Sequence, residues 1–137
     1  MYSEEITPDG RKTALEWMNC RIRNAMKNDQ AGLPEDWLPQ TGVMVKDEND
    51  RPLLAAFLYL EKSSPVAVAG WVIANPENTR RMSYNAAIIA LSALKGYARK
   101  HKAKYLMSTF GNRGVNDILK RLGFVHGEYS ENKFIIL

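Results

Sequence analysis

Three apolar segments separated by short polar turns constrain the fold more than any other feature of this sequence. The segments are residues 43–45, 52–60 and 66–74, and the last is rich in β-branched residues. The turns at 47–50 and 62–65 carry Asp, Asn, Ser and Pro. Connections this short cannot cross over a sheet, so we expect an antiparallel meander of three strands.

The hydrophobic period changes to that of a helix after the third strand. From about residue 83 to residue 100, apolar residues recur three and four positions apart, and residues 105–110 follow as a strand. A strand, a helix and a strand of these lengths form a right-handed crossover with parallel pairing. A short helix is expected over 115–122, closed by Gly123 in the left-handed conformation.

The two ends of the chain complete the predicted order of elements. Residues 13–16, Thr-Ala-Leu-Glu, match a capping box, which predicts an amphipathic helix from about 13 to 27. Residues 124–126 and 133–137 are interpreted as strands around a turn. The sequence therefore predicts one α+β (mixed α/β) domain over 1–137, with a mostly antiparallel sheet, one crossover and flanking helices.

Composition excludes several classes of protein. The chain has 137 residues, of which 45% are hydrophobic and 25% charged, as in one ordinary globular domain. Cys20 alone can form neither an internal disulfide nor a zinc cluster, and His101 and His126 lack ligand spacing, so no metal site is expected. No signal peptide or bilayer-length apolar run is apparent, which predicts a cytoplasmic protein.

The distribution of charge along the chain points to an anionic ligand. Residues 1–74 carry 8 Lys or Arg and 11 Asp or Glu, whereas residues 75–137 carry 11 and 4. A phosphate-bearing small molecule, an acidic protein or a nucleic acid would each suit the basic half. The start of the long helix, beside Arg80 and Arg81, is the expected anion site because its amides are unsatisfied and its dipole is positive.

Two short segments carry a resemblance to a known family. The first is 74–77, Ala-Asn-Pro-Glu, followed by Arg80, Arg81 and a helix rich in small residues. The second is 112–124, with an initial Asn, a basic residue and a final Leu-Gly-Phe. Together they resemble the C-terminal half of the GNAT superfamily of acyl-CoA-dependent N-acetyltransferases. The resemblance implies a GNAT-like fold, acetyl-CoA as cosubstrate and transfer of an acetyl group to an amine.

The chain departs from the family pattern at two places. The family's pyrophosphate loop is rich in glycine, whereas residues 80–86 here contain none, and Tyr84 or Ser83 takes a glycine position. Glycine lets main-chain amides approach a pyrophosphate closely, so side chains would crowd that approach. Leu119 replaces the family's Tyr, a candidate acid for the leaving thiolate.

The resemblance also implies which residues bind the cosubstrate. The strand end would pair with the pantetheine arm and supply an oxyanion donor, and the two arginines would hold phosphate. It requires that two neighbouring strands part beyond Ile73. For Asn112, helix capping is an equally good account. The implied cofactor-binding residues are Ile73, Ala74, Arg80, Arg81, Met82, Ser83, Tyr84, Asn112 and Asn116.

A general base is harder to identify than a binding site. Glu61 and Glu77 are the acids nearest to the strand 66–74, and Tyr84 is a polar group at the loop, so these three are the candidate catalytic residues. The alternatives are surface charge for the two carboxylates and core packing for Tyr84. The acceptor amine would contact residues 33–38, where Glu35, Asp36 and Trp37 would suit a cation, and residues 62–65.

Two other functions remain open at this stage. The missing glycines and the absent Tyr also fit a catalytically degenerate GNAT-like module for binding or assembly, such as a bacteriophage accessory protein. The basic half could instead bind nucleic acid, although aromatic residues are not interleaved with the lysines at 95–104. The apolar tail 134–137 could complete a partner's sheet as easily as its own, which leaves a homodimer open.

Overall fold

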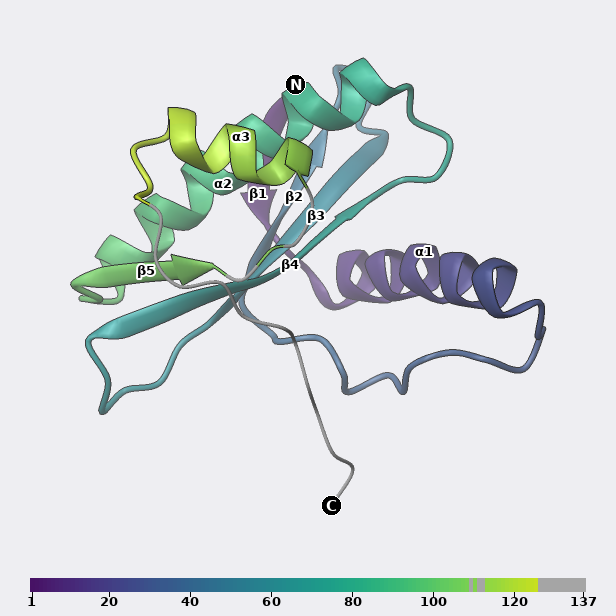
Figure 1. The fold of residues 1–137 in the computed structure, drawn as a ribbon, viewed down its shortest axis with the longest axis horizontal. Coiled ribbons are helices and arrows are strands. Elements are labelled where there is room, and N and C mark those ends of the chain that lie inside the picture. The colour runs from purple at the N-terminus through teal and green to yellow at the C-terminus, as the bar shows by residue number, and fades with distance from the viewer. Residues whose placement is uncertain (109, 111–112, 126–137) are drawn as a thin grey trace.

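The computed structural model describes residues 1–108, 110 and 113–125. Its five strands form one sheet in the order β1-β2-β3-β4-β5, antiparallel except for the parallel pair β4–β5 (Figure 1). The predicted α+β architecture with one crossover is therefore confirmed. The elements are β1 (Tyr2–Glu5), α1 (Pro8–Met26), β2 (Gly42–Lys46), β3 (Pro52–Tyr59), β4 (Val66–Ala74), α2 (Arg80–Lys100), β5 (Tyr105–Ser108) and α3 (Arg113–Arg121).

Helices cover both faces of the sheet. Helices α2 and α3 lie on one face and α1 on the other (Figure 1). The α2 face carries the larger core cluster, which includes Leu54 and Leu58 of β3. The α1 face carries a second cluster around Phe57 and Ile73. Residues 53–58 of β3 are buried on both faces, and burial of each large apolar side chain contributes about 1.5–3 kcal/mol. Strand β3 is therefore the rigid centre from which the site is built.

Helix α1 begins earlier than the sequence pattern predicts. It starts at Pro8, and the Thr7 side chain accepts a hydrogen bond from the Gly10 amide at 3.0 Å. The predicted capping box is wrong, because Thr13 lies inside the helix and donates to the Asp9 carbonyl at 3.1 Å. Proline suits the first helical turn, where its missing N–H has no intrahelical partner to lose.

Strand β1 was not predicted. It is an edge strand and largely exposed, so it lacks the apolar alternation that identified the other strands. Its contacts with the neighbouring residues are polar: Glu4 pairs with Lys46 at 2.5 Å, and the Tyr2 hydroxyl donates to Asp50 at 2.5 Å. Charged side chains are common on edge strands because they discourage pairing with another chain.

The C-terminal elements agree with the prediction in kind and differ at their ends. Strand β5 is shorter than the predicted 105–110, and α3 ends as expected before Gly123, whose φ is 91°. Lys95 of α2 donates to the Leu122 carbonyl at 2.9 Å, which ties α3 to α2. Phe124 and Val125 are not in a strand. His126 and the predicted strand 133–137 lie outside the described residues.

Candidate functional site

Strand β4 loses its parallel neighbour part-way along its length. Its pairing with β5 runs from Val66↔Tyr105 to Ala69↔Ser108, and β4 then continues to Ala74 beside β3 alone, as far as the described residues show. The register with β3 shifts at this point, since Phe57 pairs with Trp71 and Leu58 with Ala69, which leaves Gly70 in a bulge. We call the segment 70–74 the free edge of β4. The last described pair is Ala69↔Ser108, and Thr109, which follows it along the chain, lies outside the described residues, so the expected parting of the strands beyond Ile73 stays a prediction.

The alternation of the antiparallel ladder decides which main-chain groups face the free side. The Asn75 amide donates to the Leu53 carbonyl at 2.9 Å, so Asn75, and with it Ile73, is directed at β3. Val72 and Ala74 are therefore directed away from β3. The Ala74 carbonyl accordingly accepts its hydrogen bond from elsewhere, from the Arg21 guanidinium of α1 at 2.5 Å.

The N-terminus of α2 follows directly after the free edge. Thr79 caps the helix: its side chain accepts from the Met82 amide at 3.2 Å and its carbonyl from the Ser83 amide at 3.1 Å. Among the described residues, no acceptor lies within hydrogen-bond distance of the Arg80 and Arg81 amides, and both side chains are exposed. Two free amides, the positive end of the helix dipole and two guanidinium groups together suit an anion.

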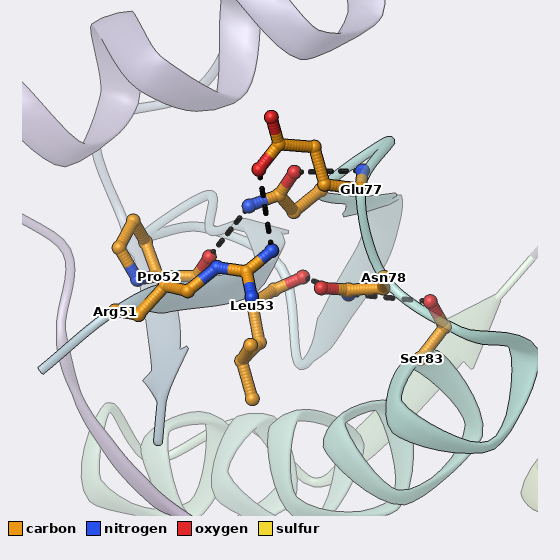
Figure 2. Close-up of polar contacts among 7 residues, drawn as sticks. Arg51, Pro52, Leu53, Glu77, Asn78 and Ser83 are labelled. Atoms are coloured by element: carbon orange, nitrogen blue, oxygen red, sulfur yellow. Dashed lines mark hydrogen bonds and ion pairs between the residues drawn. The ribbon is translucent and has the colours of Figure 1, made fainter. Parts of the chain in front are cut away.

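The loop between β4 and α2 is held by the start of β3, as Figure 2 shows. Asn75 donates to the Pro52 carbonyl at 3.0 Å and accepts from the Glu77 amide at 3.0 Å. Asn78 donates to the Leu53 carbonyl at 2.7 Å and contacts Ser83 Oγ at 3.3 Å. These side chains fix the distance between the free edge and the first turn of α2.

Solved structures of acetyltransferases superpose on nearly the whole of this chain. A probable acetyltransferase superposes with a TM-score of 0.71 at 18% identity, covering 100% of this chain and 98% of that one. The ribosomal-protein-alanine N-acetyltransferase from Brucella melitensis gives 0.63 at 15% identity, covering 90% and 83%. The aminoglycoside N-acetyltransferase AAC(6')-Iy, solved in complex with CoA, gives 0.57 at 17% identity, covering 98% of each chain.

The chain has the GNAT fold. No family model matches the sequence, and no curated protein matches it either. These identities are too low to show more than the fold, so the predicted GNAT-like architecture is confirmed and the activity is not. The structures named here give no support to a bacteriophage origin.

Within this GNAT fold, the residues of the expected pyrophosphate loop lie inside a helix. Helix α2 begins at Arg80, not near residue 83, so Met82, Ser83 and Tyr84 all belong to its first turns. Tyr84 packs into the core cluster of the α2 face, and Arg121 lies 5.9 Å above its ring. The alternative interpretation of Tyr84 as a packing residue thus has direct contacts to support it.

The structure does not bring the three candidate catalytic residues together. Glu77 is exposed and pairs with Arg51 at 3.3 Å (Figure 2). Glu61 lies on the β3–β4 turn, at the opposite end of β4 from α2, and accepts hydrogen bonds from the Ser63 hydroxyl and amide. The Ser63 hydroxyl, and then the Ser63 amide, lower the pKa of Glu61, whereas a general base at neutral pH needs a raised one.

The remaining expected residues are placed as follows. Ile73 is buried in the cluster of the α1 face, and Ala74 lies on the free edge. Asn116 is exposed on α3, and Asn112 lies outside the described residues. Among the described residues, no group of three or more His, Cys, Asp or Glu could hold a metal ion, and no helix could span a membrane.

Sequence reasoning missed two parts of the site. The first is Arg21, which reaches the free edge across 53 positions of sequence. The second is an aromatic group at the bulge: Trp71 donates to the Tyr59 hydroxyl at 2.9 Å, and the Trp37 and Trp71 rings meet edge to face at 6.3 Å. The period-2 pattern of β4 does place Trp71 and Ile73 on one face, which was the available signal for the aromatic group.

Proposed function

We propose that this protein is an acyl-CoA-dependent N-acetyltransferase, in which an amine attacks the thioester of acetyl-CoA directly. The observation that carries the proposal is that the main chain of Val72 and Ala74 is directed away from β3, in a part of β4 that pairs with β3 alone among the described residues. The edge leads to the unpaired amides of α2. A GNAT fold over nearly the full chain supports the same function.

The free edge and the helix start suit the two chemically different parts of CoA. The amide groups of a pantetheine arm would pair with the main chain of Val72 and Ala74, in the manner of an added strand. The pyrophosphate would meet the amides and side chains of Arg80 and Arg81. For the arm to reach the Ala74 carbonyl, the Arg21 guanidinium must release it.

The Val72 amide is the candidate oxyanion donor. When the amine nitrogen bonds to the acetyl carbon, negative charge develops on the carbonyl oxygen, and a fixed N–H stabilises it. The C–S bond then breaks with its electron pair going to sulfur. The products are the acetylated amine and the thiol of CoA, and one proton of the original ammonium is released.

Proton transfer needs little help from this chain. A thiol with a pKa of about 8.5 leaves readily as thiolate, so an acid at the Leu119 position is dispensable. Leu119 itself is buried in the core cluster of the α2 face. With Glu61 and Glu77 both engaged elsewhere, the ammonium proton passes to solvent in this proposal.

Binding and turnover should be measured separately. Isothermal titration with acetyl-CoA tests the site, and release of free thiol in the presence of a panel of amines tests the reaction. Saturable binding with amine-dependent thiol release is expected. Absence of binding at millimolar acetyl-CoA would refute the proposal.

A catalytically silent binding module is the second candidate. Two observations favour it: the Thr79 side chain already takes the Met82 amide, and no glycine opens the first turn of α2. Binding of acetyl-CoA without thiol release for any amine would support this alternative over the transferase.

A further inference from the structure

The α1 face of the sheet has an uncovered half beside the bulge. Helix α1 packs over Phe57 and Ile73, at the free-edge half of β4. On the other half, Tyr59 is 43% exposed and Met107 of β5 is 49% exposed, although both belong to the sheet. The described residues line there an open surface hollow of about 630 Å³ between the β3–β4 turn and β5. This volume is within the ordinary range for small-molecule sites.

The hollow has an apolar floor and one charged residue. Val66, Val68 and Met107 line its base, and Tyr59 forms a wall. Glu61 is the charged residue among the described ones that line it, and it stands on the turn at the end away from the bulge. Both Glu61 oxygens accept from Ser63, which holds the carboxylate in place while leaving further lone pairs free.

Tyr59 joins this hollow to the free edge of β4. Its ring lies against Gly70, so closely that a Cβ built on Gly70 would be 2.2 Å from Tyr59 Cε2. The hydrogen bond from Trp71 to the Tyr59 hydroxyl fixes the ring in that position. Tyr59 therefore lines the hollow and also contacts the bulge at which the free edge begins.

We propose that the hollow binds the acceptor, and that the acceptor is an α,ω-diamine: one amine reaches the bulge while the second, as an ammonium group, pairs with Glu61. This inference rests on the proposed function. The carbon chain between the two nitrogens lies over Val66, Val68 and Met107. Because hydrogen bonds from Ser63 lower the pKa of Glu61, that carboxylate is ionised at neutral pH.

The strand geometry sets the length of the diamine. Measured along the β3–β4 hairpin, Gly70 and Glu61 are separated by about four residue positions. This separation is at most ~13 Å at 3.3 Å per residue. An eight-carbon diamine comes close to this span when extended, and a three-carbon diamine falls far short of it. A monoamine of eight carbons fills the floor and leaves Glu61 unpaired.

The first test compares 1,8-diaminooctane, 1,3-diaminopropane and n-octylamine. Each is titrated into the protein saturated with CoA, and each is then assayed with acetyl-CoA for thiol release. We expect 1,8-diaminooctane to bind at least threefold more tightly than either of the others, in line with one exposed ion pair added to apolar contact. Equal affinity of 1,8-diaminooctane and n-octylamine would overturn the proposal.

Matched variants locate the second cation. Glu61→Gln keeps the size of the side chain and removes its charge, and it is expected to weaken binding of 1,8-diaminooctane about threefold to fivefold, with binding of n-octylamine unchanged. Glu48→Gln changes the net charge equally on another exposed turn and should change neither affinity. Equal weakening by both variants would show a general charge effect and refute the assignment to Glu61.

A third variant tests whether the ligands bind in the hollow or elsewhere on the surface. Met107→Ser removes an apolar wall at a half-exposed position and should weaken both eight-carbon ligands by a similar factor. No change in either ligand would place the binding elsewhere and overturn the proposal. Titration of the diamine into the protein without CoA distinguishes failure of this inference from failure of the proposed function. Diamine binding without acetyl-CoA binding refutes the transferase and with it the role of the hollow as an acceptor site, whereas acetyl-CoA binding without diamine preference refutes only this inference.

Discussion

The two halves of β4 differ in their neighbours although they belong to one continuous strand. Residues 66–69 lie between β3 and β5, whereas residues 71–74 pair, among the described residues, with β3 alone. Both halves are apolar, and both contribute side chains to the core. The difference teaches that the candidate site depends on main-chain pairing, which the polarity of the side chains does not reveal.

The first half supports the sheet, and the second half is available to a ligand. The bulge at Gly70 is the boundary between them, since it shifts the register with β3 there. Changes at the boundary, at the free edge and at the start of α2 should therefore affect function more than changes elsewhere.

The largest expected effect comes from removing the main-chain donor at the free edge. Val72→Pro eliminates the N–H that faces away from β3, so the antiparallel ladder keeps its bonds. We expect kcat/KM for the acetyl transfer to fall about 10²-fold or more. Steady-state thiol release measures this, and thermal unfolding checks the fold.

Val72→Ala is the matched control, because it shortens the same side chain and keeps the N–H. It should retain kcat/KM within a few-fold of the parent protein. If Val72→Pro were folded and equally active, the free edge would not be the site of the reaction.

The second prediction concerns the bulge itself. Gly70→Ala places a methyl group against the Tyr59 ring, at a glycine whose φ is not in the left-handed region, so the expected cost comes from crowding alone. Overpacking of this kind costs about 1–3 kcal/mol of unfolding free energy, and we expect the lower end because the ring is half-exposed.

A double-mutant cycle with Tyr59→Ala isolates this contact. In the Tyr59→Ala background the added methyl group meets no ring, so Gly70→Ala should cost close to nothing in urea unfolding. An equal cost in both backgrounds would mean that the bulge, and not Tyr59, requires glycine.

The third prediction concerns the start of α2. Arg80→Ala and Arg81→Ala should each weaken CoA binding by up to about fivefold, as expected for exposed charges. The weakening should diminish at high salt, since exposed charges are screened. Titration calorimetry at two salt concentrations measures both effects.

Arg99→Ala and Lys100→Ala remove the same charge from the other end of the same helix. These controls should leave CoA affinity unchanged. Comparable weakening from both ends would show that net charge, and not the helix start, attracts the ligand.

The smallest expected effect lies in β1, outside this comparison. The hydrogen bond to Asp50 is the main cause that raises the pKa of Tyr2 from 10.0 to about 12. A raised folded pKa means that the stabilisation is complete below pH 10 and is lost as pH rises towards 12. The parent protein should therefore lose a small part of its stability over that pH range, and the Tyr2→Phe variant should not show this loss. Acetyl transfer should be the same in both proteins.

Urea midpoints of both proteins at pH 8 and pH 11 test this prediction. Identical pH dependence of stability in the parent and in Tyr2→Phe would show that the pKa of Tyr2 is not raised in solution. The tyrosinate absorbance band gives an independent value for the pKa.

The sequence predicted the elements that alternate strongly and missed those that do not. Strand β4 was predicted with its exact bounds, because 66–74 is apolar and lies between a turn and Asn75-Pro76. Strand β1 was missed because an exposed edge strand has no buried face to impose alternation. The start of α1 was misplaced because Thr7-Pro8 and Thr13-Glu16 both carry capping signals, and only packing decides between them.

The candidate site was less predictable than the fold. The end of β4 and the place of Arg80 and Arg81 beside the long helix followed from local pattern and from the family resemblance, whereas the helix start was predicted near residue 83 and lies at Arg80. The bulge at Gly70 depends on pairing between distant segments, and the contact from Arg21 to Ala74 depends on how α1 packs on the sheet. Such long-range contacts leave no periodic signal in a single sequence.

The hydrogen bond from Arg21 to Ala74 has one further consequence. The Ala74 carbonyl oxygen cannot accept a full hydrogen bond from the Arg21 guanidinium and from a ligand amide at the same time. Ligand binding at the free edge and the packing of α1 on the sheet are therefore coupled equilibria. A compound that binds the Ala74 carbonyl would therefore loosen the attachment of α1 to the sheet, and amide hydrogen exchange along 18–26 would detect the change.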